Sequence, residues 1–151
     1  MNKLKTGAWV LVADGEKALF LENEGDTQDY NLKVRRKEEH ENPPAREQAA
    51  NRPGRLNDGP GEHKSALDDT DWHELEKERF ADDLAEILYK RAHRGAFKEI
   101  VLIAAPDTLG ALRNVLHPEV ARCVVGEIPK NLTNMPIDKM EKHIKAGLEA
   151  G

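Results

Sequence analysis

Two observations on the sequence predict a mixed α/β domain. Near the start of the chain, short apolar runs are separated by turn-forming residues, which is the pattern of antiparallel strands. After about residue 70, stretches with helical spacing alternate with short apolar runs, the pattern of helices that connect parallel strands. The expected order is therefore three strands, a long loop, and then helix, strand, helix, strand and helix.

The N-terminal part predicts an antiparallel meander of three strands. Residues 8–14 form the first apolar run, and Asp14-Gly15 is a strong hairpin signal before the second run at residues 18–22. The third run, residues 30–34, alternates apolar and polar side chains. We therefore expect one face of this strand to be exposed to water.

Hydrophobic residues nearly vanish from about residue 38 to residue 69, where we expect a long mobile loop. Prolines interrupt this stretch, and Leu56 is the only large aliphatic residue between residues 38 and 64. Structureless loops of this length are uncommon in compact domains unless they are functional or disordered. The loop is therefore the first candidate for contact with a partner, with a merely solvated loop as the alternative.

A long helix follows the loop. Asp71 and Glu74 resemble a capping pair and predict its start. Apolar side chains then recur mostly at three- and four-residue steps, which places them on one helix face. These side chains are Trp72, Leu75, Phe80, Leu84, Ile87 and Leu88. Basic residues crowd the last turns, where they complement exposed carbonyl groups, and Gly95 is suited to end the helix.

The C-terminal part predicts two buried strands and two helices. Residues 100–105 form a strand buried on both faces, and residues 106–116 form a helix that begins with Pro106. Residues 122–128 form the last strand, and a final helix follows Pro136. The buried side of that helix carries Ile137, Met140, Ile144 and Leu148. Strands joined through helices predict parallel neighbours in a mixed sheet covered by helices.

Composition excludes several classes of protein. A length of 151 residues fits one domain, residues 1–151. There is no apolar run long enough to span a membrane and no secretory signal, so we expect a cytoplasmic protein. The single cysteine, Cys123, excludes an internal disulfide and a multi-cysteine zinc site. A net charge of -5 argues against general coating of nucleic acid.

The residues that most resemble catalytic groups have simpler structural interpretations. No two of the six histidines have the helical spacing of a zinc site, and Cys123 at the start of a buried strand favours core packing. Asp14 and Asp107 follow strand ends, where α/β proteins often bind ligands, yet a hairpin and a helix cap explain them. Lys64-Ser65 lacks the preceding glycine of a phosphate loop. We therefore predict no catalytic residue, no metal and no cofactor.

Charge separates the predicted loop from the helix after it. Residues 33–64 contain eight basic and six acidic residues, whereas residues 65–86 contain two basic and nine acidic residues. Arg52 and Arg55 flank Pro53-Gly54 in the less negative part. Glycine lets a backbone approach a ligand closely and arginine supplies paired donors, so this pattern favours contact with phosphates.

Several segments together resemble the bacterial host attachment family, whose members are described as required for attachment to host cells. The most specific segment is Ala-Pro-Asp-Thr-Leu-Gly-Ala-Leu-Arg at residues 105–113. The matching segments span nearly the whole chain, at residues 9–15, 18–20, 80–85, 102–113 and 130–136. That family in turn resembles the middle domain of archaeal and eukaryotic peptide-chain release factors.

The resemblance implies a ribonuclease-H-like fold and a loop that faces the ribosome or tRNA. In release factors, a Gly-Gly-Gln tripeptide at the tip of this loop positions water for hydrolysis of peptidyl-tRNA. This chain has no Gly-Gly-Gln, and neither Gln28 nor Gln48 follows two glycines. The resemblance therefore implies binding without that chemistry. The RNA-binding residues that we infer are Arg46, Arg52, Gly54, Arg55, Gly59, Gly61 and Lys64.

We thus expect a non-catalytic, release-factor-like domain that binds ribosomes or tRNA through its long loop. One alternative is a role in host-cell attachment, either indirect or through a protein partner, since a chain without a signal peptide is a poor candidate for a surface adhesin. A second alternative is a hydrolase acting on peptidyl-tRNA or RNA, which rests on fold analogy alone.

Overall fold

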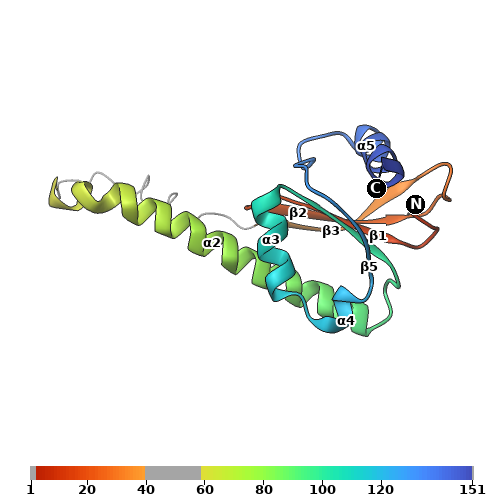
Figure 1. Cartoon of the computed structure of the whole chain (residues 1–151), viewed down its shortest axis with the longest axis horizontal. Coiled ribbons are helices and arrows are strands. Elements are labelled where there is room, and N and C mark those ends of the chain that lie inside the picture. Colours follow the sequence, from red (N-terminus) through yellow and green to blue (C-terminus); the bar gives the residue numbers. More distant parts are fainter. Residues whose placement is uncertain (1–2, 40–58, 151) are drawn as a thin grey trace.

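The computed structural model describes residues 3–39 and 59–150, with side chains for residues 3–39 and 74–149. One mixed sheet carries helices on both faces (Figure 1). Its strands are β1 (Trp9–Ala13), β2 (Lys17–Asn23), β3 (Leu32–Glu39), β4 (Ile100–Ala104) and β5 (Val124–Ile128). The helices are α2 (Gly59–His93), α3 (Pro106–Val115), α4 (Pro118–Ala121) and α5 (Ile137–Ala150).

The sheet has the spatial order β3-β2-β1-β4-β5. β1, β2 and β3 form an antiparallel meander, and β4 and β5 run parallel to β1 on its other side. The predicted mixed sheet is confirmed, as is the order of its strands and main helices. The arrangement is compatible with the release-factor-like fold that the family resemblance implies.

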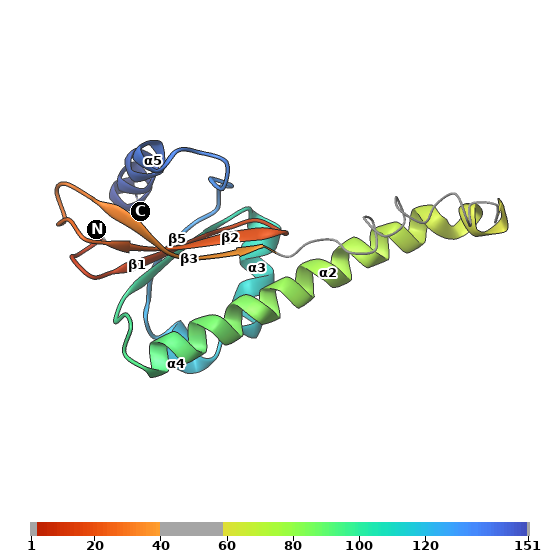
Figure 2. The ribbon, with the colours of Figure 1, turned by 180° about the vertical axis from the view of Figure 1, so that it is seen from behind.

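Two cores lie on opposite faces of this sheet. On β1, Trp9, Leu11 and Ala13 face one core and Val10 and Val12 face the other, because alternate residues of a strand point to opposite sides. α2, α3 and α4 cover the first face, and α5 covers the second (Figure 2). Burial on both faces explains the continuous apolar sequences of β1 and β4.

The predicted hairpin between β1 and β2 is confirmed. Asp14 Oδ1 accepts hydrogen bonds of 2.8 Å from the backbone N–H groups of Glu16 and Lys17. Such bonds from an aspartate to the backbone two and three residues on are the usual reason for aspartate in a turn. The short turn then pairs β1 with β2 in register from Ala13 and Ala18 onward.

β3 differs from its prediction of residues 30–34, since the strand runs from Leu32 to Glu39. It lies at the edge of the sheet, where its charged side chains stay in water while its backbone pairs with β2. Phe20 pairs with Arg36 and Leu21 with Val34, so Arg35 is an extra residue in a β-bulge. Charge on both faces hid this strand from a search for apolar alternation.

The predicted loop over residues 38–69 is wrong at both of its ends. Residues 38 and 39 belong to β3, and residues 59–69 are helical because α2 begins at Gly59. The pair Asp71 and Glu74 therefore lies inside α2 and not at its start. The sequence of the early turns of α2 contains only one large apolar residue, Leu67, before Trp72, so it shows no apolar periodicity, although Pro60 suits a first turn. Residues 40–58 lie outside the described residues, so the mobility expected there stays a prediction.

The end of α2 was predicted correctly. Gly95 has a φ of 77°, a conformation that glycine adopts without strain. Its N–H donates to the carbonyl of Ala92, and the N–H of Ala96 donates to the carbonyl of Arg91. These two bonds form the Schellman motif that satisfies carbonyls at the end of a helix.

The predicted C-terminal strands and helices are confirmed, with several differences. β5 begins at Val124 and only its last residue, Ile128, is buried, and the short helix α4 was not predicted. Leu109 and Leu112 are buried on α3, and Met140, Ile144 and Leu148 are buried on α5, whereas Ile137 is half-buried. Asp107 does not cap α3, because the N-cap position is Ala105 and no side chain bonds to it. In the described part of the chain, no helix has the length and apolar character needed to cross a membrane.

Candidate functional site

The residues predicted to bind RNA lie at or before the start of α2. Gly59, Gly61 and Lys64 belong to its first turns and not to a loop, which corrects their expected setting. The other four predicted contacts fall outside the described residues: Arg46, Arg52, Gly54 and Arg55. Their contact with RNA stays a prediction.

α2 extends far beyond the sheet. Its 35 residues make a helix about 52 Å long at about 1.5 Å per residue. Among its described side chains, Phe80, Leu84 and Leu88 pack into the core, whereas Leu75 is 41% exposed. Figures 1 and 2 show the N-terminal part projecting away from the rest of the domain. The beginning of α2 is thus held at a distance from the sheet.

Lys77 marks the place where α2 leaves the domain. Its Nζ donates to Asp107 Oδ2 at 2.8 Å and to Glu74 Oε1 at 3.3 Å. Its stem lies against the hairpin, because a Cβ on Gly15 would be 3.3 Å from Lys77 Cγ. The hydrogen bond to Asp107 raises the pKa of Lys77, and the same bond lowers the pKa of Asp107. One lysine therefore connects α2 to the ends of β1 and β4.

A polar cluster lies at the carboxyl end of β1, where α/β sheets often bind ligands. The Thr133 hydroxyl donates to Asp14 Oδ2 at 2.8 Å, and the Thr133 N–H donates to Asn131 Oδ1 at 3.0 Å. Lys17 Nζ donates to Asn134 Oδ1. These bonds join the hairpin to the segment after β5, so Asp14 has a structural role on both of its oxygens.

Among the described residues, the side chains considered as candidates for catalysis are better explained by structural roles. Within this described part of the chain, no group of three or more histidine, cysteine or acidic side chains is placed to hold a metal ion. Cys123 is half-buried beside the core, and burial raises the pKa of its thiol. A neutral thiol is a poor nucleophile, so the predicted packing role of Cys123 is the better interpretation.

Charge is unevenly distributed along α2. A groove of about 420 Å³ between α2 and α3 is lined by Glu74, Glu78, Asp82 and Asp107, with Lys77 among them. At the other end, Arg91 lies in the last turn of α2 and Arg94 directly follows the helix. Sequence reasoning assigned the basic last turns of α2 to the helix dipole and missed their neighbours on the sheet, which only the fold brings close.

The mixed sheet with a long projecting helix defines a release-factor-like α/β domain. Residues 7–144 match the model for bacterial archaeo-eukaryotic release factor family 12, and the chain belongs to this family. The match supports the release-factor-like part of the resemblance and does not confirm the host attachment name. No curated protein matches the chain.

Proposed function

We propose that this chain is a non-catalytic, translation-related domain that binds ribosomes or tRNA through the outer end of α2 and the arginines that precede it. Membership in a release-factor-like family supports a partner in the translation machinery. The projection of α2 supports contact at a distance, since a fixed helix presents its first residues well away from the sheet.

The observation that carries the proposal is the attachment of α2. Phe80, Leu84 and Leu88 are buried, and Lys77 adds polar bonds where the helix leaves the domain. A rigid support lowers the entropy lost when the outer end meets a partner. The absence of Gly-Gly-Gln from the sequence removes the motif on which release-factor hydrolysis depends.

Co-sedimentation with ribosomes tests the proposal. The wild-type protein should pellet with ribosomes at about 50 mM KCl and dissociate largely by about 200 mM, because contacts with phosphates weaken steeply with salt. Arg52→Ala with Arg55→Ala should weaken binding about tenfold. The matched control, Lys139→Ala with Lys142→Ala, removes the same charge from exposed positions on α5.

Two results would contradict the proposal. The first is a wild-type protein that stays in the supernatant at low salt with both ribosomes and tRNA. The second is equal binding by the arginine pair variant and the lysine pair variant, which would mean that net charge and not the outer end of α2 governs association. Release of peptide from peptidyl-tRNA by the purified protein would contradict its non-catalytic character.

A further inference from the structure

We propose a second RNA contact at the opposite end of α2, where Arg91 and Arg94 with Trp9 and Arg36 form a site for backbone phosphates. These four residues are called the inner basic surface below. The site is new and separate from the outer end of α2, and only the choice of RNA as the phosphate-bearing polymer rests on the proposed function.

The first observation is the position of Arg91 over Trp9. The guanidinium carbon of Arg91 lies 5.4 Å from the centroid of the Trp9 ring, which is the geometry of a cation–π contact. Phe97 also packs against the Trp9 ring, with ring centroids 5.5 Å apart. Arg94 directly follows the last residue of α2, three positions after Arg91 and just before the turn at Gly95.

The second observation is that Arg36 of β3 lies on the face of the sheet that α2 covers. Arg36 pairs across the strands with Phe20, and Phe20 belongs to the core beneath α2. Residues directly opposite in neighbouring strands share a face, so Arg36 lies on the α2 side of the sheet. Burial lowers the pKa of Arg91, and the positive charges of Arg36 and Arg94 lower it further.

The third observation is the lack of acidic partners for two of these cations. Arg36 pairs with Glu38 at 3.0 Å, and the neighbouring Arg35 pairs with Glu22 and Glu24. Among the described residues, neither Arg91 nor Arg94 takes part in an ion pair. Glu38 thus offsets the charge of Arg36, whereas Arg91 and Arg94 have no such partner in the described part of the chain, and an added anion would relieve the repulsion between them.

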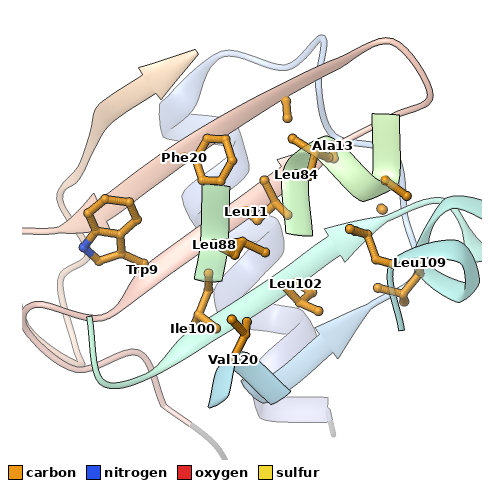
Figure 3. Packing of buried hydrophobic residues seen from close by; sticks show 14 of the residues in the cluster. Trp9, Leu11, Ala13, Phe20, Leu84, Leu88, Ile100, Leu102, Leu109 and Val120 are labelled. Carbon is orange, nitrogen blue, oxygen red and sulfur yellow. The ribbon is translucent and has the colours of Figure 1, made fainter. Parts of the chain in front are cut away.

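The fourth observation is a hydrogen-bond donor without an acceptor. Trp9 is 3% exposed, and its indole Nε1 has no hydrogen-bond partner in the part of the chain that the structure describes. Buried polar groups are nearly always paired, so such a group needs an explanation. Figure 3 shows this nitrogen at the outer edge of the cluster, turned away from Leu11 and Leu88. The guanidinium of Arg91 and the N–H of Trp9 are thus neighbouring donors, and a phosphate oxygen can accept from both once Arg91 turns to bind it.

A hollow of about 360 Å³ adjoins the segment that follows Arg94. It is lined by Gly95, Phe97 and Lys98, and also by the acidic Glu22 and Glu99. A Cβ on Gly95 would have no atom within 4 Å, so the backbone there is open to a ligand. Arginine suits phosphate because its planar fork donates two parallel hydrogen bonds, and lysine does not replace it in this respect.

Fluorescence anisotropy with fluorescein-labelled octauridylate tests the inner basic surface. Arg91→Gln with Arg94→Gln should weaken binding at least tenfold. The dependence of log affinity on log salt should flatten by about 1.4, since each single-strand phosphate contact contributes about 0.7. The matched control, Lys139→Gln with Lys142→Gln, should lose less than twofold. Arg94→Gln alone should lower the affinity for octauridylate about threefold. Because Arg94 is exposed, this single variant should fold normally even if the double variant does not.

Trp9 reports on its own site. Trp72→Phe leaves Trp9 as the only tryptophan, and octauridylate should change its emission as Arg91 leaves the ring. Inorganic phosphate and octaglutamate are tested as alternative ligands in the same assay. Binding of either one as tightly as octauridylate would overturn the assignment to an RNA backbone. An unchanged affinity and salt slope in the Arg91 and Arg94 double variant, or silence of Trp9 during binding, would overturn the site itself.

The two proposals fail in different ways. If octauridylate binds through Arg91 and Arg94 while ribosomes and tRNA do not bind, the proposed function is wrong and the site stands. If ribosome binding depends on Arg52 and Arg55 but octauridylate binding is unaffected by Arg91→Gln with Arg94→Gln, the site is wrong and the proposed function stands.

Discussion

Leu84→Ala tests the anchoring of α2 on which the proposed function depends. Leu84 is fully buried between α2 and the sheet, beside Leu11 and Leu88 (Figure 3). Truncating a buried leucine to alanine costs about 3–5 kcal/mol, because apolar contacts are lost and a cavity remains. At about 2–4 °C per kcal/mol for a chain of this size, a loss of about 3 kcal/mol lowers the melting temperature by roughly 6–12 °C.

The same helix supplies the matched control. Leu75→Ala makes the identical chemical change at a position that is 41% exposed, so its effect should stay within about 0.5 kcal/mol. Urea unfolding followed by circular dichroism measures both variants, with the slope m unchanged if the transition stays two-state. Equal destabilisation by the two variants would refute the packing described for α2, and a stable Leu84→Ala protein would show that the helix does not depend on this core.

Three further changes test other contacts. Asp107→Asn should lower stability at pH 7 by less than about 1 kcal/mol because the pair is exposed, and the variant should lose less stability between about pH 5 and pH 2. The sign follows from the lowered pKa of Asp107: its contribution is present above the ordinary carboxyl pKa and is lost as pH falls through the folded value, which urea midpoints across pH would record. Thr133→Val keeps the shape but removes the hydroxyl bond to the hairpin aspartate, so the urea midpoint should fall by an amount equivalent to about 1–2 kcal/mol. Gly147→Ala should destabilise the wild-type protein, because its Cβ would lie 2.8 Å from Ile128 Cδ1, yet should stabilise an Ile128→Val protein by up to about 1 kcal/mol; the same sign in both backgrounds would contradict the contact.

The sheet was predictable from sequence wherever burial left an apolar pattern. β1 and β4 are buried on both faces and read as continuous apolar runs, and the hairpin after β1 was readable from Asp14-Gly15. β3 was only partly predictable, since an edge strand carries charged side chains on its exposed positions and its pairing comes from the backbone. The early turns of α2 escaped detection for a related reason, because residues 59–71 contain only one large apolar side chain and so show no helical periodicity in the sequence.

The candidate contacts at the two ends of α2 differ in whether the sequence alone could predict them. Arg52 and Arg55 attracted attention because glycine and proline lie beside them. The inner basic surface could not be found in this way, because Trp9, Arg36 and Arg91 are far apart in the chain. Their meeting depends on the bulge that sets the register of β3 and on the direction in which α2 crosses the sheet. Long-range pairing of this kind leaves no local signal.

The middle of α2 limits where RNA can touch the protein. Glu74, Glu78 and Asp82 line an acidic groove there, which repels phosphates, so contacts should be confined to the two ends of the helix. Lys64 and Arg91 are 27 positions apart, which corresponds to about 40 Å along the helix. An octanucleotide bound at the inner basic surface should therefore be indifferent to changes at the outer end.

Combining the two pairs of arginine changes tests this separation. Arg52→Ala and Arg55→Ala with Arg91→Gln and Arg94→Gln should weaken ribosome binding by about the product of the two separate effects, since distant sites contribute additive free energies. The affinity of the fourfold variant for octauridylate should equal that of the variant with only Arg91→Gln and Arg94→Gln. Loss of octauridylate binding from the outer pair would contradict the separation, because binding of a short strand would then depend on both pairs of arginines. Two distant contacts also favour a large, shaped RNA over a short strand, since only the former can engage both ends of α2 and gain the added affinity of linked sites.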